Sequence, residues 1–209
     1  MPWVRVVPLV LFLAAAPGGV ALADESCGDL ARRARSECDQ GRDATDRDVR
    51  EAHWQRGKAL AERAIQLDDN DANAHFALFC NQGELMRIDG ESITSVFEFR
   101  RLMKELDRAL ELDPNNLDAL SSKGTLLVRL PRLMGGDTKR GEALLREVVD
   151  RDPKAFNARL ALCRSLEERG DRAEAVAFAT RALEIAKEQG RSDRVDQARA
   201  ELAKLGATH

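Results

Sequence analysis

The residues that come closest to a chemical motif lie in LPRLMGGDTKRGEALL, positions 130–145. Two adjacent glycines followed by Asp, Thr, Lys and Arg could form a loop that holds a phosphate. A loop of the GxxxxGK[S/T] type needs Lys and then Ser or Thr directly after its second glycine, because these side chains contact the phosphates and magnesium. After Gly141 this sequence has Glu142 and Ala143, and the preceding SSKGTLLVRL has helical rather than strand periodicity. The stretch therefore lacks both the ligands and the context of a phosphate loop.

The same stretch fits a turn between two helices. Pro131 followed by Gly135 and Gly136 would end one helix and turn the chain. Asp137 or Thr138 would then cap the next helix through its side-chain oxygen. If the protein has a contact surface specific to its family, we expect it at Gly135, Gly136 and Asp137.

Two other groups of residues could do chemistry but fit structural roles better. DDND at positions 68–71 could suggest calcium, but it lacks the glycine and the terminal glutamate of an EF-hand loop. His75 and Cys80 are a base and a thiol, yet five positions along a helix point them in different directions. No Ser-His-Asp combination, Cys-X-X-Cys pair or metal-ligand spacing of histidines is present in the sequence. We therefore expect a protein without catalysis, cofactor or metal.

Composition and charge narrow the class of partner. The 209 residues include 33 Lys and Arg against 36 Asp and Glu, a formal net charge of −3, with six prolines and no tyrosine. This is a helix-favouring composition, and its length suits one domain with a substantial core. Nucleic-acid binding is not expected, because no overall basic charge is present to neutralise phosphates.

Residues 1–23 have the features of a secretory signal peptide. Arg5 gives a positive start, VVPLVLFLAAAP gives a short apolar run, and ALA at 21–23 is the small-x-small pattern that signal peptidase accepts. PGG at 17–19 interrupts the run before it reaches the roughly 20 apolar residues of a membrane span. We expect cleavage after Ala23, export of a bacterial type to the periplasm or medium, and no stable membrane anchor afterwards.

Export would permit disulfides among the four cysteines. Cys27 and Cys38 are too far apart to bond along one continuous helix, at about 1.5 Å of rise per residue. Cys80 and Cys163 lie in apolar helical patterns, where a cysteine most often acts as a small hydrophobic residue. Three complete pairings are possible, and the sequence does not select one of them.

Four similar segments recur along the chain and indicate a repeat. They are RAIQLDDND from Arg63, RALELDPNN from Arg108, EVVDRDPKA from Glu147 and RALEIAKEQ from Arg181. Their starts are separated by 45, 39 and 34 residues. The last spacing is the period of a helix-turn-helix solenoid.

Small residues within the repeats recur at helical spacing. Gly57, Ala61 and Ala64 stand at i, i+4 and i+7, and Ala175, Ala179 and Ala182 repeat the pattern. Residues so spaced share one helix face, where small side chains let a neighbouring helix approach closely. We expect each unit to be an antiparallel helix pair that packs against the next pair.

Two segments resemble tetratricopeptide repeats. ALELDPNNLDALSSKG is similar to the junction between two repeats, with Ala109, Pro114, Leu120 and Gly124 at the family's spacing. FNARLALCRSLEERGDRAEAVAFATRALEI is similar to one whole repeat. The resemblance covers roughly residues 52–190 and implies an all-α, right-handed α-solenoid of antiparallel helix pairs.

A narrower resemblance rests on the extended unit that begins AHFALFCNQGELMRIDG, together with the Gly-Gly-Asp turn. Both are similar to exported tetratricopeptide proteins related to the TRAP-transporter-associated T component. That resemblance implies an accessory role in solute uptake, with a small ligand or a solute-binding protein as partner.

About nine helices are predicted, the last one capping the solenoid. The expected ranges are 26–41, 47–68, 71–88, 92–112, 115–130, 138–151, 154–169, 172–189 and 192–205. We divide the chain into a signal peptide (1–23), an N-terminal helical segment (24–50), a tetratricopeptide-like domain (51–190) and a capping helix (191–209).

A solenoid of helix pairs usually binds its partner on the concave face formed by the first helix of each pair. The expected function is a non-catalytic scaffold that holds a protein or peptide there, and the oligomeric state is left open. The residues expected to line the groove are Asn73, Phe76, Cys80, Ser121, Thr125, Val128, Asn157, Leu160 and Arg164.

Overall fold

The computed structural model describes residues 25–88 and 96–206, and within these ranges the chain forms nine α-helices, one short 3₁₀ turn and no strand. The elements are Cys27–Asp43 (α1), Arg47–Leu67 (α2), Ala72–Leu85 (α3), Val96–Leu112 (α4), Leu117–Arg129 (α5), Arg132–Met134 (η1), Thr138–Arg151 (α6), Phe156–Glu168 (α7), Arg172–Glu188 (α8) and Ser192–Lys204 (α9). The predicted all-α class is confirmed. The predicted signal peptide and its cleavage site lie outside the described residues, as does the expected start of the fourth helix.

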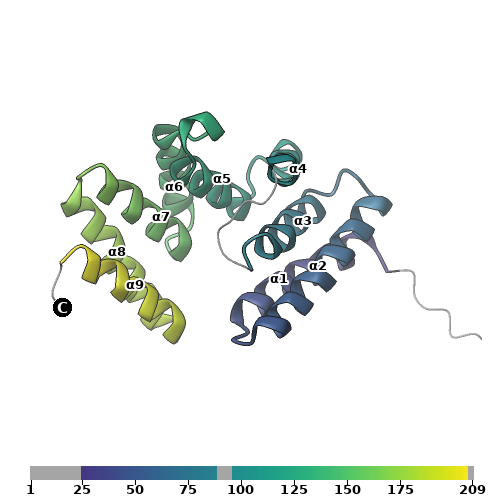
Figure 1. The fold of residues 1–209 in the computed structure, drawn as a ribbon, viewed down its shortest axis with the longest axis horizontal. Helices are drawn as coiled ribbons and strands as arrows, with labels where there is room; N and C mark the ends of the chain where they lie inside the picture. The colour runs from purple at the N-terminus through teal and green to yellow at the C-terminus, as the bar shows by residue number, and fades with distance from the viewer. Residues whose placement is uncertain (1–24, 89–95, 207–209) are drawn as a thin grey trace, which may run out of the picture.

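The helices form antiparallel pairs that stack into an arch (Figure 1). The pairs are α1 with α2, α3 with α4, α5 with α6 and α7 with α8, and α9 packs on the last pair. The odd-numbered helices lie on the inner side of the arch. Its two ends meet at an ion pair, in which Arg191 Nη2 before α9 lies 2.6 Å from Asp43 Oδ1 at the end of α1.

The first helix belongs to the solenoid rather than to a separate segment. α1 packs against both α2 and α3, and only three residues connect it to α2. The predicted boundary at residue 50 therefore falls inside a helix that is continuous from Arg47 to Leu67.

Small residues mark the places where helices approach most closely, as the spacing predicted. Ala61, Ala64, Ala175, Ala179 and Ala182 are fully buried. At the crossing of α5 and α6, a Cβ added to Gly124 would lie 3.0 Å from the carbonyl oxygen of Gly141, and one added to Gly141 would lie 2.8 Å from that of Gly124. The two backbones are thus in contact, and neither position has room for a side chain.

Replacing Gly141 with alanine is expected to lower the free energy of unfolding by about 1–3 kcal/mol, because the new methyl group must displace backbone. Urea unfolding followed by circular dichroism measures the change. Gly28→Ala in α1 is the control, since an added Cβ there meets nothing within 4 Å. Alanine is also the better helix former, so this variant should be as stable as the parent or more so. A Gly141 variant that matches it would show that the helices are not in contact.

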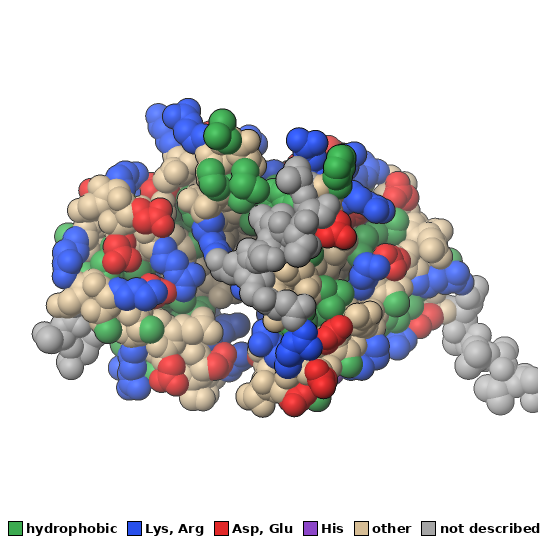
Figure 2. Space-filling model, viewed as in Figure 1, with side chains coloured by type: hydrophobic (Ala, Val, Ile, Leu, Met, Phe, Trp, Pro, Cys, Tyr) green, Lys and Arg blue, Asp and Glu red, His purple; other side chains and the backbone are tan. Residues whose placement is uncertain are grey.

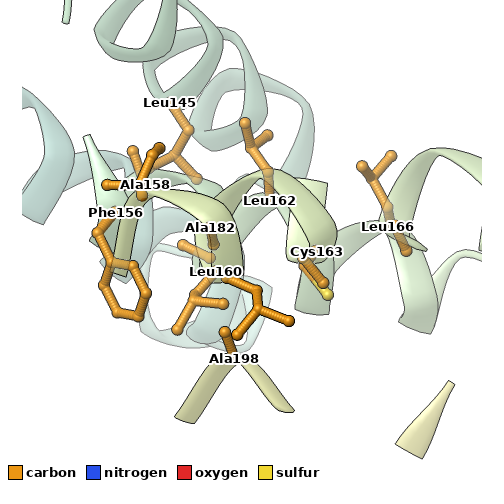
Figure 3. Close-up of a cluster of buried hydrophobic side chains, with 14 of the residues drawn as sticks. Leu145, Phe156, Ala158, Leu160, Leu162, Cys163, Leu166, Ala182 and Ala198 are labelled. Atoms are coloured by element: carbon orange, nitrogen blue, oxygen red, sulfur yellow. The ribbon is translucent and has the colours of Figure 1, made fainter. Parts of the chain in front are cut away.

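The two halves of the arch are held together differently. One large apolar cluster runs through α5 to α9 and includes Leu145, Leu162, Leu166 and Ile185, all fully buried (Figure 3). Only small apolar clusters are found among α1 to α4, and other buried residues there, such as Trp54, belong to none of them. The N-terminal half therefore needs other sources of stability.

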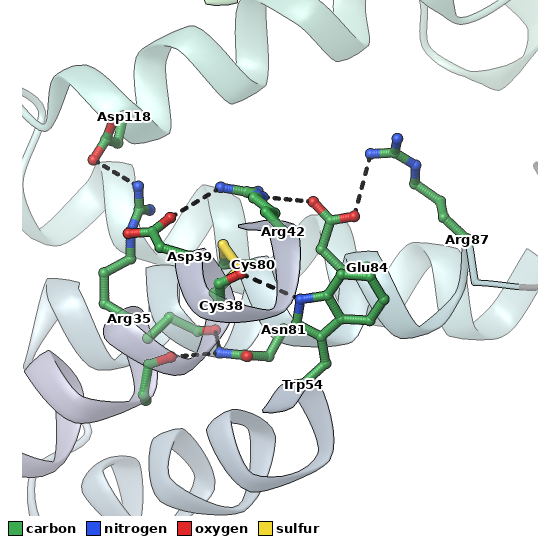
Figure 4. The surroundings of a disulfide bond; sticks show 12 residues. Arg35, Cys38, Asp39, Arg42, Trp54, Cys80, Asn81, Glu84, Arg87 and Asp118 are labelled. Atoms are coloured by element: carbon green, nitrogen blue, oxygen red, sulfur yellow. Dashed lines mark hydrogen bonds and ion pairs between the residues drawn. A yellow bond between two sulfur atoms is a disulfide. The ribbon is translucent and has the colours of Figure 1, made fainter. Parts of the chain in front are cut away.

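Covalent and polar links supply that stability in the N-terminal half. Cys38 of α1 and Cys80 of α3 form a disulfide (Figure 4), which settles the pairing that the sequence left open. Cys27 and Cys163 are free thiols. Beside the disulfide, Asn81 donates from Nδ2 to the carbonyl oxygens of Ala34 and Ala77, both at 2.9 Å. These links join α1 to α3 directly.

Candidate binding surface on the concave face

The concave face consists of the solvent-exposed sides of α1, α3, α5, α7 and α9. It is clearest at α7, which packs against α5, α6, α8 and α9 and so has one side left for solvent. Asn157 and Arg164 stand seven residues apart on α7 and are both exposed. A separation of seven returns to the same face of a helix, so the two side chains mark the open side of α7.

The predicted groove residues divide into two groups. Asn73 and Arg164 are exposed like Asn157, and Ser121 and Thr125 on α5 are partly exposed. Thr125 donates a hydrogen bond from Oγ1 to the carbonyl oxygen of Ser121, at 2.8 Å. These five polar residues are accessible to a partner.

The other four predicted groove residues are buried, and their assignment to an open groove was wrong. Phe76, Cys80, Val128 and Leu160 are each 8% exposed or less. Cys80 is in the disulfide, so it is no free thiol. Val128 and Leu160 belong to the large apolar cluster. The helices turn these positions towards their neighbours because packing within and between pairs occupies most of each helix surface.

Arginines from neighbouring helices cover two of the buried rings. The guanidinium of Arg35 on α1 lies 4.8 Å from the ring centroid of Phe76, and that of Arg194 on α9 lies 5.3 Å from the centroid of Phe156. Such stacking is a cation–π interaction. Sequence reasoning missed both arginines, because each partner ring is on another helix and no spacing within one helix indicates the pair.

Two glutamates are buried behind the concave face, and each is held by arginine. Glu84 accepts from Arg42 Nε at 2.7 Å, and Arg87 Nη1 lies 3.7 Å away (Figure 4). Glu201 accepts from Arg164 Nη2 at 2.6 Å. The carboxylates are almost inaccessible while the guanidinium groups remain about half exposed. The buried acids therefore fix the positions of these arginines.

Ion pairs also tie three inner helices together. Arg35 Nη2 of α1 lies 3.1 Å from Asp118 Oδ2 at the start of α5, and Arg35 Nε lies 3.3 Å from Asp39 of its own helix. Arg42 continues the row from Asp39 to Glu84 of α3 (Figure 4). The row crosses from the first helix pair to the third and helps to fix the curvature of the concave face.

The ion pair between Glu201 and Arg164 is sensitive to acid because of the surroundings of the carboxylate. Burial by itself would raise the pKa of Glu201, but hydrogen bonds and charges from Arg164 and Lys204 outweigh it and lower the pKa below its ordinary 4.5. A carboxyl whose pKa is lowered by folding stabilises the folded state above its unfolded pKa. That contribution is lost as the pH falls through the lowered value.

Glu201→Gln is therefore expected to lower the free energy of unfolding by about 1–3 kcal/mol at pH 7, with a difference that shrinks towards zero in acid. Urea unfolding at pH 7 and at successively lower pH measures it. Glu184→Gln removes an exposed partner of Arg181 and is the control, with little effect at any pH. A Glu201→Gln difference that did not change with pH would contradict the assignment.

The free thiols and His75 are held in protonated or hydrogen-bonded states. Burial raises the pKa of Cys163 to about 11, and burial with the nearby Asp71 raises that of Cys27 to about 11. Both therefore stay protonated at neutral pH, and the thiolate is the nucleophilic form. His75 is buried, with its Nδ1 2.7 Å from Glu105 of α4. It is engaged between α3 and α4 and not with a thiol.

The turn between α5 and α6 has the capping role that the sequence predicted. The Asp137 side chain accepts from the backbone N–H of Arg140 at 3.0 Å. Gly135 has φ of +92°, in the left-handed region that favours glycine. A Cβ on Gly136 would lie 1.7 Å from the carbonyl oxygen of Leu130. A family-specific contact at these three residues remains a prediction.

Within the described ranges, no group of three or more His, Cys, Asp or Glu side chains could hold a metal ion. The DDND stretch has a structural role in that part of the chain, since Asp71 caps α3 by accepting from the N–H groups of Asn73 and Ala74. No described helix is long and apolar enough to cross a membrane.

Stacked antiparallel helix pairs with small residues at their crossings define a tetratricopeptide-like solenoid. A sequence model of the tetratricopeptide repeat matches residues 132–192. The model described as "Regulator of microtubule dynamics protein 1-3" matches residues 22–130, just over half of the chain, and the chain belongs to that family. Neither model describes the TRAP-associated group, so the narrower resemblance has no support from them. No curated protein sequence matches the chain.

Solved structures with this arrangement include several of MamA. "Crystal structure of MamA" is 17% identical, with 80% of this chain and 82% of that one covered and a TM-score of 0.51. "MamA 41-end from Desulfovibrio magneticus RS-1" is 16% identical, with 86% and 95% covered and a TM-score of 0.51. "MamA AMB-1 P212121" is 19% identical, with 85% and 95% covered and a TM-score of 0.51. At this identity the likeness concerns the fold alone.

Proposed function

We propose that the chain is an exported, non-catalytic scaffold that binds a protein or peptide segment along its concave face. The observation that carries the proposal is the open side of the inner helices, where Asn73, Ser121, Thr125, Asn157 and Arg164 are accessible. Amide, hydroxyl and guanidinium groups can bond the backbone and side chains of an extended segment. Tetratricopeptide-like folds suggest protein partners.

Two features support export. The first 23 residues have the pattern of a secretory signal. The Cys38–Cys80 disulfide is of a kind that persists in oxidising compartments and is rare in reducing ones. The proposal therefore places the protein in the periplasm or outside the cell.

The absence of catalysis is proposed from the state of the reactive groups. The raised pKa values of Cys27 and Cys163 keep both thiols protonated, and His75 is engaged with Glu105. The family's name refers to regulation of microtubule dynamics. The residues of the concave face give no reason to transfer that activity to this chain.

A matched pair of substitutions tests the proposed surface. Asn157→Arg puts a bulky charge on the open side of α7, and Ala177→Arg puts the same group on an exposed position of α8, an outer helix. Both variants should fold, since both sites face solvent. Proteins captured from a cell-envelope extract by the parent chain should be reduced at least tenfold with Asn157→Arg and retained with Ala177→Arg. Capture that is equal for the two variants would overturn the proposal.

A further inference from the structure

A second surface combines exposed apolar groups with unpaired positive charge. The described residues contain few large apolar side chains that are exposed, and three of them lie in α4 and η1. Leu133 in η1 is fully exposed, Met134 beside it is 41% exposed, and Phe97 at the start of α4 is 76% exposed.

The backbone holds Leu133 outward. Gly136 donates to the carbonyl oxygen of Pro131 at 3.1 Å, and the N–H of Asp137 donates to that of Leu127 at 2.9 Å. Together with the left-handed Gly135, these bonds fix the turn in one shape. The hydrogen-bonded turn therefore holds the Leu133 side chain in an exposed position.

Six cations lie on the same elements, three in α4 and three around η1. They are Arg100, Arg101 and Lys104 in α4, and Arg132, Lys139 and Arg140 around η1, and all are exposed. Within the described ranges none of the six forms a salt bridge, whereas arginines elsewhere, such as Arg42 and Arg169, are paired with acids.

Acidic residues near these six cations already interact with other groups. Glu98 lies in the first turn of α4 and has a partner of its own. Asp137 caps α6, and Glu142 is buried against Ser165 and Arg169. Glu105 and Asp107 of α4 are engaged by His75 and Lys123. The surface is therefore locally basic although the whole chain has a formal charge of −3.

We propose that α4 and the η1 turn dock on an anionic lipid surface. Figure 2 shows blue and green side chains in two groups on the upper edge of the molecule, one over the α5–α6 turn and one over α4. The apolar groups stand out individually on these elements, a geometry that suits insertion between lipid headgroups while the cations contact phosphates. A protein partner would need a separate pocket for each of these apolar side chains. This site lies away from the Asp43–Arg191 contact and leaves the concave face free (Figure 1).

Vesicle co-sedimentation tests the proposal, with the chain that begins at Asp24, which contains all nine helices of the described ranges. The probes are vesicles of phosphatidylcholine alone and of equal parts phosphatidylcholine and phosphatidylglycerol. We expect binding to the second kind only, and its loss at high salt. Each cation near an anionic surface contributes about fivefold, so Arg132→Gln, Lys139→Gln and Arg140→Gln together should weaken binding roughly 100-fold. Leu133→Ser should weaken it about fivefold or more.

Matched controls separate this role from general charge and hydrophobicity. Val49→Ser removes another exposed apolar side chain, and Lys154→Gln with Lys187→Gln removes two exposed cations elsewhere. Both controls should bind as the parent does, and all variants should keep the parent's melting temperature. No binding by the parent, equal binding to neutral vesicles, or equal loss in the controls would overturn the proposal. Capture by polyglutamate beads without vesicle binding would assign the cations to an acidic protein and also overturn it.

Discussion

Replacing Trp54 with alanine is expected to lower the free energy of unfolding by about 3–5 kcal/mol, the usual cost of removing a buried tryptophan side chain. The indole is fully buried on α2. It lies against Gly41 of α1, where an added Cβ would come 2.3 Å from its Nε1 atom. Nε1 also donates to the carbonyl oxygen of Cys38 at 3.2 Å. The substitution would open a cavity between α1 and α2 and remove this hydrogen bond between the two helices.

Urea unfolding followed by circular dichroism measures this loss, because the variant lacks the indole that fluorescence would report. Val49→Ala on the same helix is the control, since Val49 is about half exposed and should change stability little. A loss below about 1 kcal/mol for Trp54→Ala would show that the indole is not packed between the helices.

Replacing both Cys38 and Cys80 with serine is expected to cost about 2–4 kcal/mol. The disulfide spans 42 residues of sequence and restricts the unfolded chain, so its loss favours the unfolded state. The effect should be large because the apolar clusters of α1 to α4 are small. Local opening should therefore appear first in this half, which hydrogen exchange would report.

A reductant provides the matched experiment for the disulfide. Dithiothreitol should destabilise the parent by a similar amount and leave the Cys38→Ser/Cys80→Ser variant unchanged. Cys27→Ser is the control, because Cys27 is a free thiol whose Sγ contacts the carbonyl oxygen of Ala64, which a hydroxyl can also reach. A parent protein whose stability does not respond to the reductant would contradict the pairing.

The helices and their crossings could be predicted because their signals are local. The i, i+4, i+7 series of small residues predicts a close helix crossing, and Ala61, Ala64, Ala175, Ala179 and Ala182 of these series are in fact fully buried. Asp137 and Asp71 cap helices. Caps are expected where a short polar side chain directly precedes a segment with helical apolar periodicity. Each of these features depends on a few neighbouring residues.

The features that depend on two distant helices could not be predicted. Cys38 meets Cys80 because α1 and α3 lie side by side, and nothing in either helix alone selects this pair from the other pairings. For the same reason Phe76 and Leu160 seemed available for a groove, although packing buries them. The stacking of Arg35 on Phe76 again joins α1 to α3. A single sequence indicates which residues share a helix face. It does not indicate which neighbouring helix packs against that face.

The turn at 130–145 shows what the structure added to a local motif. Its capping and chain reversal were predicted, and both are confirmed by Asp137 and Gly135. The sequence predicted a family-specific contact surface at Gly135, Gly136 and Asp137. The structure shows that they shape the turn and that Leu133 and the cations near it are exposed beside them, while a contact at the three residues stays a prediction.

Site-specific photo-cross-linking can locate a protein segment that is bound along the concave face. A photoreactive phenylalanine analogue would be placed at Asn73 and Asn157 on the inner helices, and at Ala177 on α8, all exposed positions. After irradiation in cells, we expect the same discrete cross-linked protein from Asn73 and Asn157 and none from Ala177. Cross-links from Ala177 with none from the two inner positions would contradict this expectation.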